Sequence, residues 1–321
     1  MFQPSWVLPE QGYDKALALL KEVLKPYAQH GYFHAPDGAR LYYEAYRAPG
    51  HDKAVLLVHG FTEFAEKYTE MVGCFFRAGY DVYLYEQRGH GRSERAVADL
   101  QVVHVARFSE YVADVRAFTV QMILPRQYVQ IDLFSHSMGG AVAALFLSES
   151  DCPVRRAILS APMIAPRTSN IPRSAVLLRL RQLGRKQGFE KPFSHAGHFN
   201  PRASFAHSSD NSPARFAANM RCRLSNECCQ TSTGTVGWTY EAISLEHKLV
   251  YRVAPQIRVP MLLLSGTNDR VVKRGPQRRF ARHAQACRFV LIPDGKHGLF
   301  TASREELVRY YTMIFSFLEA P

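Results

Sequence analysis

Short apolar segments alternate along most of the chain with longer segments of helical periodicity. Residues 54–58 are all apolar, which is typical of a strand that is covered on both faces of a sheet. Further strands are expected at residues 82–85, 129–134 and 157–159, and buried strands at residues 261–264 and 289–292. Helices are expected at residues 12–28, 67–78, 108–124, 138–148 and 305–318, and a hairpin at residues 31–47. This alternation predicts an α/β fold with a mostly parallel, doubly wound sheet between layers of helices.

One long interval interrupts this alternation. Residues 162–253 are rich in Arg, Ser, Asn and His, and they contain no clear buried strand. Because strands are expected on both sides of the interval, it is interpreted as an insertion into one sheet. We therefore expect a core in two parts, residues 1–162 and 253–321, separated by a largely helical cap at residues 163–252.

The expected cap contains a segment in which leucines alternate with basic side chains. It runs from Pro172 to Gly188 and predicts a basic amphipathic helix. Two interpretations remain open: a lid that lies on an anionic lipid surface, or a cap helix whose apolar face covers the active site while its arginines face water. Residues 236–249, with Trp238 and Tyr240, predict a second cap helix.

The 321 residues carry a surplus of positive charge. Lys and Arg exceed Asp and Glu by 40 − 28 = 12, which favours nucleic acid or an anionic membrane surface as a partner. The chain has no zinc-finger, RNA-binding or phosphate-loop motif, so no nucleic-acid partner is expected. It also has no secretory signal pattern and no apolar run of roughly 18–20 residues that would span a bilayer. We expect a cytoplasmic protein, with peripheral contact at the inner, anionic membrane face as its closest approach to a membrane.

The six cysteines do not form a recognisable framework. No C-x-x-C pair occurs, and the density of cysteines is far below that of a disulfide-stapled domain. Reduced thiols are therefore expected. Cys222, Cys228 and Cys229 are close in the sequence, but their spacing is not that of a zinc site. No metal and no cofactor are expected.

A serine lies in the short turn between an expected strand and an expected helix. The segment Ser135-His136-Ser137-Met138-Gly139 has the pattern of a nucleophile elbow, which exposes a serine hydroxyl at a tight strand-to-helix turn. Small residues two positions before and after Ser137 let the backbone fold back, and Ser135 stands where the motif usually has glycine. By itself the segment would also fit a helix start with an ordinary surface serine.

A serine hydroxyl needs a general base, and that base needs an orienting carboxylate. Asp269 and His297 follow two later strands in the chain order serine, acid, histidine that this motif requires. Because the carboxyl ends of parallel strands share one edge of the sheet, Ser137, Asp269 and His297 are expected to converge there as a catalytic triad. Asp294 is a rival acid, but its Pro-Asp-Gly context predicts a turn.

The loop after residues 54–58 is the expected partner of the elbow in the oxyanion hole. A tetrahedral intermediate needs two backbone N–H donors, and we expect these from Phe61 and Met138. His59 precedes the acid in the chain and does not fit the triad order, so it is expected to hold the loop by hydrogen bonding. His90 and His136 are likewise expected to be structural.

At these motifs the chain resembles the monoacylglycerol lipase and lysophospholipase branch of the α/β hydrolases. Residues 59–63, His-Gly-Phe-Thr-Glu, with Tyr68 are similar to its H-G-x-x-E…Y signature. Residues 89–94 are similar to its G-H-G-x-S-E loop, with Glu86 where aspartate is common. The elbow, acid and base segments match too, whereas the cap matches weakly. The resemblance implies an α/β-hydrolase fold and hydrolysis of one acyl ester on a glycerol head group, without a cofactor.

The leading prediction is therefore a serine hydrolase that cleaves the acyl ester of a lysophospholipid or monoacylglycerol, with a single-chain lipid or small ester as substrate. A general carboxylesterase and a small-peptide aminopeptidase are alternatives on the same fold. An aminopeptidase needs an acidic anchor for the substrate amine, and the cap has few acids. A catalytically inactive ligand-binding protein is the alternative from another class, and the complete triad argues against it.

Overall fold

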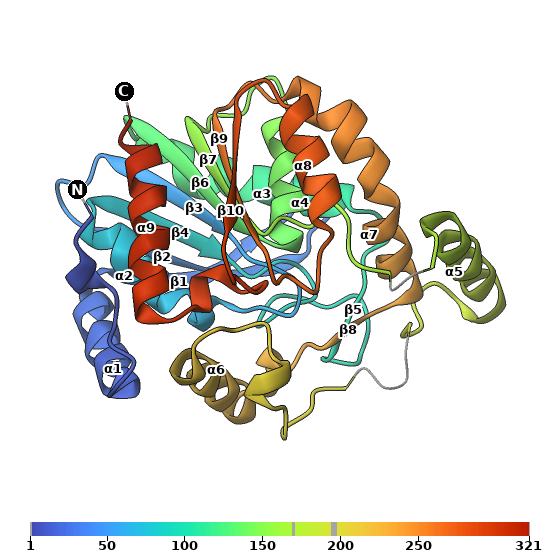
Figure 1. The fold of residues 1–321 in the computed structure, drawn as a ribbon, viewed down its shortest axis with the longest axis horizontal. Coiled ribbons are helices and arrows are strands. Elements are labelled where there is room, and N and C mark those ends of the chain that lie inside the picture. The colour runs from blue at the N-terminus through green and yellow to red at the C-terminus, as the bar shows by residue number, and fades with distance from the viewer. Residues whose placement is uncertain (1, 169–170, 194–197, 321) are drawn as a thin grey trace.

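The computed structural model describes residues 2–168, 171–193 and 198–320, which contain one eight-stranded sheet (Figure 1). Its strands, in sheet order, are β1 (Ala28–His34), β2 (Arg40–Tyr46), β4 (Tyr80–Tyr85), β3 (Lys53–Val58), β6 (Gln130–His136), β7 (Arg156–Ser160), β9 (Met261–Gly266) and β10 (Cys287–Ile292). β1, β2 and β4 pair antiparallel, and every pairing from β4 to β10 is parallel. The predicted mostly parallel sheet is confirmed.

Helices cover both faces of this sheet (Figure 1). On one face pack α1 (Tyr13–Leu24), α2 (Thr69–Arg77) and α9 (Arg304–Leu318). On the other pack α3 (Ser109–Phe118), α4 (Met138–Leu147) and α8 (Arg274–His283), the last of which the sequence pattern did not predict. In β3, Val55 and Leu57 face the first layer, whereas Leu56 and Val58 face the second. The uninterrupted apolar run of this strand therefore reflects burial on both sides.

Two predicted helices depart from their predicted lengths. The helix expected at residues 12–28 ends at Leu24, because Pro26 cannot donate a backbone hydrogen bond and the chain then enters β1. The helix expected at residues 108–124 leaves α-helical geometry after Phe118 and continues as a wider π-helical turn.

The strand expected at residues 289–292 was predicted to be buried, and that prediction is wrong. β10 is the last strand of the sheet, with β9 as its neighbour on one side. Its side chains are half-buried or exposed, Leu291 being 44% exposed. An apolar run alone does not distinguish a central strand from an edge strand, because an edge strand also packs apolar side chains on both faces, here Phe289 on one and Val290 and Ile292 on the other.

Between β7 and β9, the described residues form three long helices: α5 (Arg173–Gln187), α6 (Pro213–Ser225) and α7 (Val236–Lys248). α5 and α7 agree with the two predicted cap helices, and α5 and α6 lie at the periphery of the molecule (Figure 1). α6 was not predicted, although its start carries a recognisable signal. Ser212 caps the helix by accepting from the backbone N–H of Arg215, and Pro213 occupies the first turn.

A strand pairing and a helix join the last part of the cap segment to the core. A short parallel ladder pairs β5 (Val102–Val103) of the core with β8 (Thr233–Gly234) just before α7. α7 then contributes side chains to the main hydrophobic core, Trp238 and Leu245 among them. α5, by contrast, packs on α7 through a small separate cluster that includes Leu180, Val236 and Ile243. α5 is therefore attached to the molecule mainly through α7.

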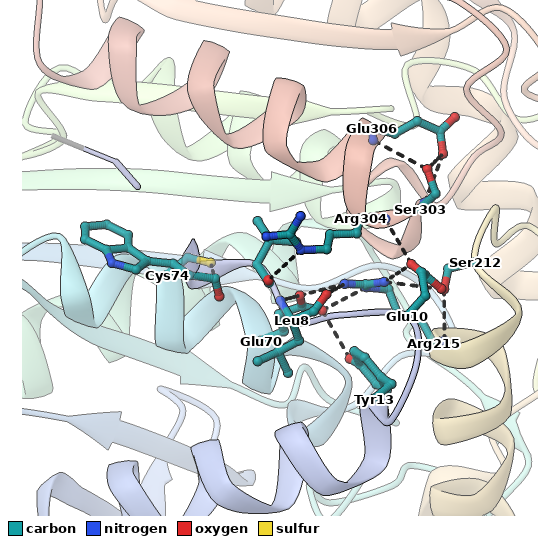
Figure 2. A network of polar contacts seen from close by, with 12 residues as sticks. Leu8, Glu10, Tyr13, Glu70, Cys74, Ser212, Arg215, Ser303, Arg304 and Glu306 are labelled. Atoms are coloured by element: carbon teal, nitrogen blue, oxygen red, sulfur yellow. Dashed lines mark hydrogen bonds and ion pairs between the residues drawn. The ribbon is translucent and has the colours of Figure 1, made fainter. Parts of the chain in front are cut away.

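A buried arginine attaches α6 to the core (Figure 2). Arg215 donates from Nε and Nη2 to the two carboxylate oxygens of Glu70 on α2, at 2.8 and 2.7 Å. It also pairs with Glu10 and donates to the carbonyl of Leu8 at 3.0 Å, both in the N-terminal segment. Tyr13 donates to the same Glu70 carboxylate. These contacts hold α6, α2 and the N-terminal segment together around one guanidinium group.

Candidate active site

The turn between β6 and α4 holds Ser137 in an unusual backbone conformation. Its φ and ψ are 52° and −118°, outside the regions that non-glycine residues normally occupy. The turn is held by close packing: a Cβ on Gly139 would lie 2.2 Å from the carbonyl oxygen of Val58. Ser135, which replaces the usual glycine, fits because its hydroxyl donates to the carbonyl of Ile158 at 3.2 Å. The structure therefore contains the strained strand-to-helix elbow that the sequence predicts.

Three predicted residues meet at the carboxyl edge of the sheet. His297 Nε2 lies 2.8 Å from the hydroxyl oxygen of Ser137, and His297 Nδ1 lies 2.8 Å from Oδ2 of Asp269. Since a carboxylate accepts, Nδ1 carries the proton in this arrangement and Nε2 is left to accept from the serine hydroxyl. All three residues are buried, with exposed fractions of 6–7%. This is the geometry of a nucleophile, its base and an orienting acid.

The electrostatics of the site suit those roles. Burial lowers the pKa of His297, and this effect outweighs the hydrogen bond to Asp269, so the imidazole is neutral at neutral pH. For Asp269, burial acts to raise the pKa, but the hydrogen bond from His297 and those from the backbone N–H groups of Val271 and Val272 lower it. The pair therefore consists of a neutral base beside an ionised acid.

The rival acid lies elsewhere. Asp294 occupies a turn with φ 55°, and its carboxylate accepts from Asn268 Nδ2 at 3.4 Å at the surface. Its backbone N–H bonds to the hydroxyl of Thr267, as expected for a turn residue. The structure thus places Asp269 against His297 and Asp294 in the turn.

The loop after β3 lies against the elbow and is held by His59. The Nδ1 of His59 donates to the carbonyl of Gly60 at 2.7 Å, and its Nε2 accepts from the backbone N–H of Gln87 at 2.8 Å. Burial lowers the pKa of His59 to about 4, which keeps the ring neutral for both contacts. Phe61 stacks on Trp238 of α7, with ring centroids 4.0 Å apart. These contacts set the position of the Phe61 backbone relative to Ser137.

The backbone N–H of Met138, the second expected oxyanion donor, lies at the start of a helix. Met138 is the first residue of α4, where the backbone N–H has no acceptor within its own helix. Its side chain is fully buried, so the position of its backbone is fixed by packing. The loop before Phe61 also lies against the elbow, because a Cβ on Gly60 would lie 3.0 Å from the Cβ of Ser137.

A buried polar network behind these loops was not predicted. Glu63 is its centre and accepts at 2.5–3.0 Å from four groups: the backbone N–H of Gly60, Lys67, Tyr68 and His136. His136 in turn lies 3.1 Å from the carbonyl of His297. Burial acts to raise the pKa of Glu63, but the charges of Lys67 and His136 hold that pKa well below its usual value. The network connects the oxyanion loop, the elbow and the histidine loop.

The sequence did carry a signal for this network. Glu63 and Tyr68 belong to the H-G-x-x-E…Y signature, and His136 belongs to the elbow. Their mutual contacts were not visible, because Glu63 and His136 are 73 positions apart in the chain. His136 and His90 were expected to be structural, and His90 does bond to the carbonyl of Arg88 at 3.1 Å.

A hollow of about 320 Å³ opens beside His297. Its lining combines the loops that carry Asp269 and His297 with the cap segment before α6. Two basic residues, Arg270 and Lys296, take part, together with His207 of the cap. The hollow therefore offers positive charge next to the catalytic geometry.

The sheet and this site define a class: an α/β protein with the geometry of a serine hydrolase site. The chain belongs to the family described as serine aminopeptidase, S33, whose model matches residues 49–304. It is thus a hydrolase, and the matched range contains all three residues that meet at the sheet edge.

Two relatives of the chain are named as lipid hydrolases. The chain is similar to lysophospholipase L2 of Escherichia coli, with 28% identity over 258 residues, which are 77% of this chain and 73% of that protein. It is also similar to the monoglyceride lipase of Rattus norvegicus, with 31% identity over 145 residues, 43% of this chain and 45% of that protein.

Solved structures show the same fold. A soluble variant of monoglyceride lipase from Saccharomyces cerevisiae superimposes with a TM-score of 0.70 at 16% identity, covering 91% of this chain and 96% of that one. A carboxyl esterase from Bacillus coagulans gives 0.70 at 19% identity, covering 91% and 97%. The predicted α/β-hydrolase fold is confirmed.

Proposed function

We propose that the chain hydrolyses the acyl ester of lysophospholipids or monoacylglycerols, with Ser137 as nucleophile, His297 as general base and Asp269 as orienting acid. The observation that carries the proposal is the pair of 2.8 Å contacts that join these three side chains at the sheet edge. The two named groups of relatives, a lysophospholipase and a monoglyceride lipase, support the substrate class.

The reaction follows from this geometry. His297 takes the proton as the Ser137 oxygen attacks the ester carbonyl, while Asp269 stabilises the imidazolium that forms. The backbone N–H groups of Phe61 and Met138 stabilise the oxyanion. When the tetrahedral intermediate collapses, His297 returns the proton to the departing alcohol and leaves an acyl-enzyme. Water, activated by the same imidazole, then releases the fatty acid and restores Ser137.

The basic hollow favours lysophospholipids over uncharged monoacylglycerols. Arg270 is exposed and Lys296 is half-buried, and both line the space next to His297. A phosphate on the substrate head group would be attracted there by charge, whereas a free glycerol would not. Replacement of Arg270 by Ala should therefore lower kcat/KM for lysophospholipid by roughly tenfold, or about 1.4 kcal/mol, and leave that for monoacylglycerol unchanged.

A panel of substrates tests the assignment. The purified chain is offered lysophospholipids and monoacylglycerols of matched acyl length, a short soluble ester and an aminoacyl anilide. Labelling by a fluorophosphonate probe, absent in Ser137→Ala, is measured in parallel. Turnover of the lipid esters with labelling supports the proposal. Turnover of short esters alone indicates a general carboxylesterase, turnover of the anilide indicates the aminopeptidase of the family description, and no labelling indicates an inactive ligand-binding protein.

Contact with an anionic membrane at the inner face of the cytoplasmic membrane is the second part of the proposal. No helix among the described residues has the length and apolar character needed to cross a bilayer, so any contact would be peripheral. Most apolar side chains of α5 pack against α7, but Leu178 is 59% exposed. The side chains of Arg179, Arg181 and Arg185 are exposed too. Attraction by charge is therefore the main support for membrane contact.

A further inference from the structure

Two cysteines of the cap segment lie close to a carboxylate of the core. Cys222 lies near the end of α6, and Cys229 ends the next short turn, Glu227–Cys229. Glu66 belongs to the turn Ala65–Tyr68, which follows the oxyanion loop. The two Sγ atoms and a carboxylate oxygen of Glu66 all lie within 4.8 Å of one another. Both cysteines are free thiols, and Cys229 is 1% exposed.

We propose that Glu66, Cys222 and Cys229 bind a zinc-like divalent cation, which joins the cap to the loop behind the oxyanion hole. Two thiolates and a carboxylate are ligands that Zn²⁺ prefers, whereas Mg²⁺ and Ca²⁺ take oxygen ligands alone. With bonds of about 2.3 Å to sulfur, ligand atoms of a tetrahedral site lie roughly 3.8 Å apart. The cluster therefore needs a closure of about 1 Å or less at its longest edge to fit.

Other polar side chains contact the proposed ligands, as the outer residues of metal sites do. Glu66 Oε1 pairs with the guanidinium group of Arg92, while its Oε2 is buried without a hydrogen bond. Asn226 donates to the sulfur of Cys222 at 3.8 Å. Carboxylate and thiolate ligands in proteins are commonly oriented by such outer partners. Oε2 of Glu66 is thus free to bind an ion.

The turn that carries Cys229 is itself held in place. Arg95 of the core donates to the carbonyl of Cys228 at 3.0 Å, and Arg223 of α6 donates to the carbonyl of Cys229 at 3.1 Å. These contacts fix the backbone on both sides of the thiol. A ligand that is held before the metal arrives costs less conformational entropy on binding, which favours affinity.

Charge and space are both compatible with an ion. Two thiolates and one carboxylate carry three negative charges, and a divalent cation leaves one, next to the guanidinium of Arg92, which also lies 3.6 Å from carboxylate oxygens of Glu44 and Glu86. The thiol protons are released to solvent when the cation binds. A cavity of about 60 Å³ touches both Glu66 and Cys222, which is enough for a water molecule as the fourth ligand. The predicted absence of a metal site considered the cysteines alone, and their spacing gave no indication of Glu66.

Titration with Co²⁺ tests the proposal on the reduced, chelator-free full chain. Co²⁺ bound by thiolates absorbs in the near ultraviolet, and this band reports sulfur ligation directly. We expect one Co²⁺ per chain, displacement by Zn²⁺, and a higher thermal unfolding midpoint with Zn²⁺. Cys222→Ser and Cys229→Ser should each lose most of the band. Glu66→Gln keeps both sulfurs, so its band should persist while Co²⁺ affinity falls by at least about tenfold.

Cys228→Ser is the matched control, because it removes the neighbouring thiol and leaves the three proposed ligands. It should bind Co²⁺ like the unchanged chain. The metal-free unfolding midpoint of every variant is measured, so that a fold defect is distinguished from loss of a ligand. No thiolate band in the unchanged chain, or an equal loss in Cys228→Ser, would overturn the proposal. Because none of these readouts uses ester turnover, they are independent of the proposed function.

Discussion

At the scale of single residues, Ser137, His297 and Asp269 depend on one another. Each of the two hydrogen bonds that join them is 2.8 Å long, and the imidazole can serve the hydroxyl only while its other nitrogen donates to the carboxylate. The strained conformation of Ser137 holds its hydroxyl at the distance that the base requires. Substitutions at the three positions should therefore lower activity by different factors, but each acts by breaking this chain of two hydrogen bonds.

Substitutions at these positions should separate the acid from its rival. Ser137→Ala should abolish ester hydrolysis, and Asp269→Asn should lower kcat by about 10⁴-fold, because the imidazole would take the wrong tautomer. Asp294→Asn should change kcat little, since its carboxylate faces Asn268 at the surface. Steady-state kinetics on a soluble ester measure all three. A severe loss in Asp294→Asn with a mild one in Asp269→Asn would reverse the assignment of the acid.

The pH dependence of the reaction follows from His297. The imidazole acts as a base only when neutral, and burial lowers its pKa below the ordinary value of 6.5. Activity should therefore persist at pH 6.5 and decline only as the pH falls through the lowered pKa. Asp269, whose pKa is also lowered, stays ionised over that range. A profile of kcat/KM against pH measures this, and an acid limb centred above 6.5 would contradict it.

At the scale of elements, Glu63 joins three loops that the chain reaches separately. Glu63→Gln keeps the size of the side chain but removes the charge that Lys67 and His136 balance. We expect kcat to fall by about ten- to a hundredfold with KM little changed, a smaller effect than loss of a whole oxyanion donor. Tyr68→Phe removes one donor to Glu63 and should have an intermediate effect. Unchanged kcat in Glu63→Gln would show that the loops hold their positions without this network.

The attachment of α6 should depend on one ion pair. Arg215 and Glu70 have side chains only 2% and 6% exposed, so Arg215→Ala leaves the buried Glu70 carboxylate without a cation, although Leu8 and Tyr13 still donate to it. The free energy of unfolding should fall by about 3–5 kcal/mol. Arg221→Ala is the matched control on the same helix, because its pair with Asp14 is more than half exposed. It should cost less than about 1 kcal/mol. Equal effects in urea denaturation would show that the buried pair does not anchor the helix.

At the scale of the whole molecule, the surplus of 12 positive charges should bring the chain to anionic membranes. Each basic residue near the surface contributes about 1 kcal/mol, so cosedimentation should be strong with phosphatidylglycerol vesicles, weak with neutral ones, and reduced by salt. Reversal of Arg179, Arg181 and Arg185 of α5 to Glu should weaken binding without loss of turnover of a soluble ester.

The control is a variant with the same change of net charge on a different helix, α8. Arg274, Arg278 and Arg282 are exposed on α8, and their reversal to Glu alters the net charge equally. If α5 is the contact surface, this variant should bind vesicles better than the α5 variant. Equal binding by the two variants would leave net charge, and no particular helix, as the cause. Equal binding to neutral and anionic vesicles would contradict the membrane proposal.

Local patterns were sufficient for the sheet and for the three side chains that meet at its edge. Buried strands need apolar side chains on both faces, and a nucleophile elbow needs small residues at set positions, so both leave a continuous trace in the sequence. The order serine, acid, histidine then selects Asp269 and His297, because parallel strands end at one edge. Predictions failed where one local pattern fits two structures. The apolar run of β10 fits a central strand as well as an edge strand, and in the structure it lies at the edge of the sheet.

Contacts between distant parts of the chain were decided by the tertiary structure alone. Glu63 meets His136 and Arg215 meets Glu70 across 73 and 145 positions, and a buried charge can be matched by any partner that the fold brings near. The cap shows the same dependence, because α5 and α6 are basic helices whose positions are set by packing on α7 and by the ion pair of Arg215, respectively. The sequence shows which polar and charged side chains need a partner if they are buried. Only the packing of the folded chain determines which partner each of them has.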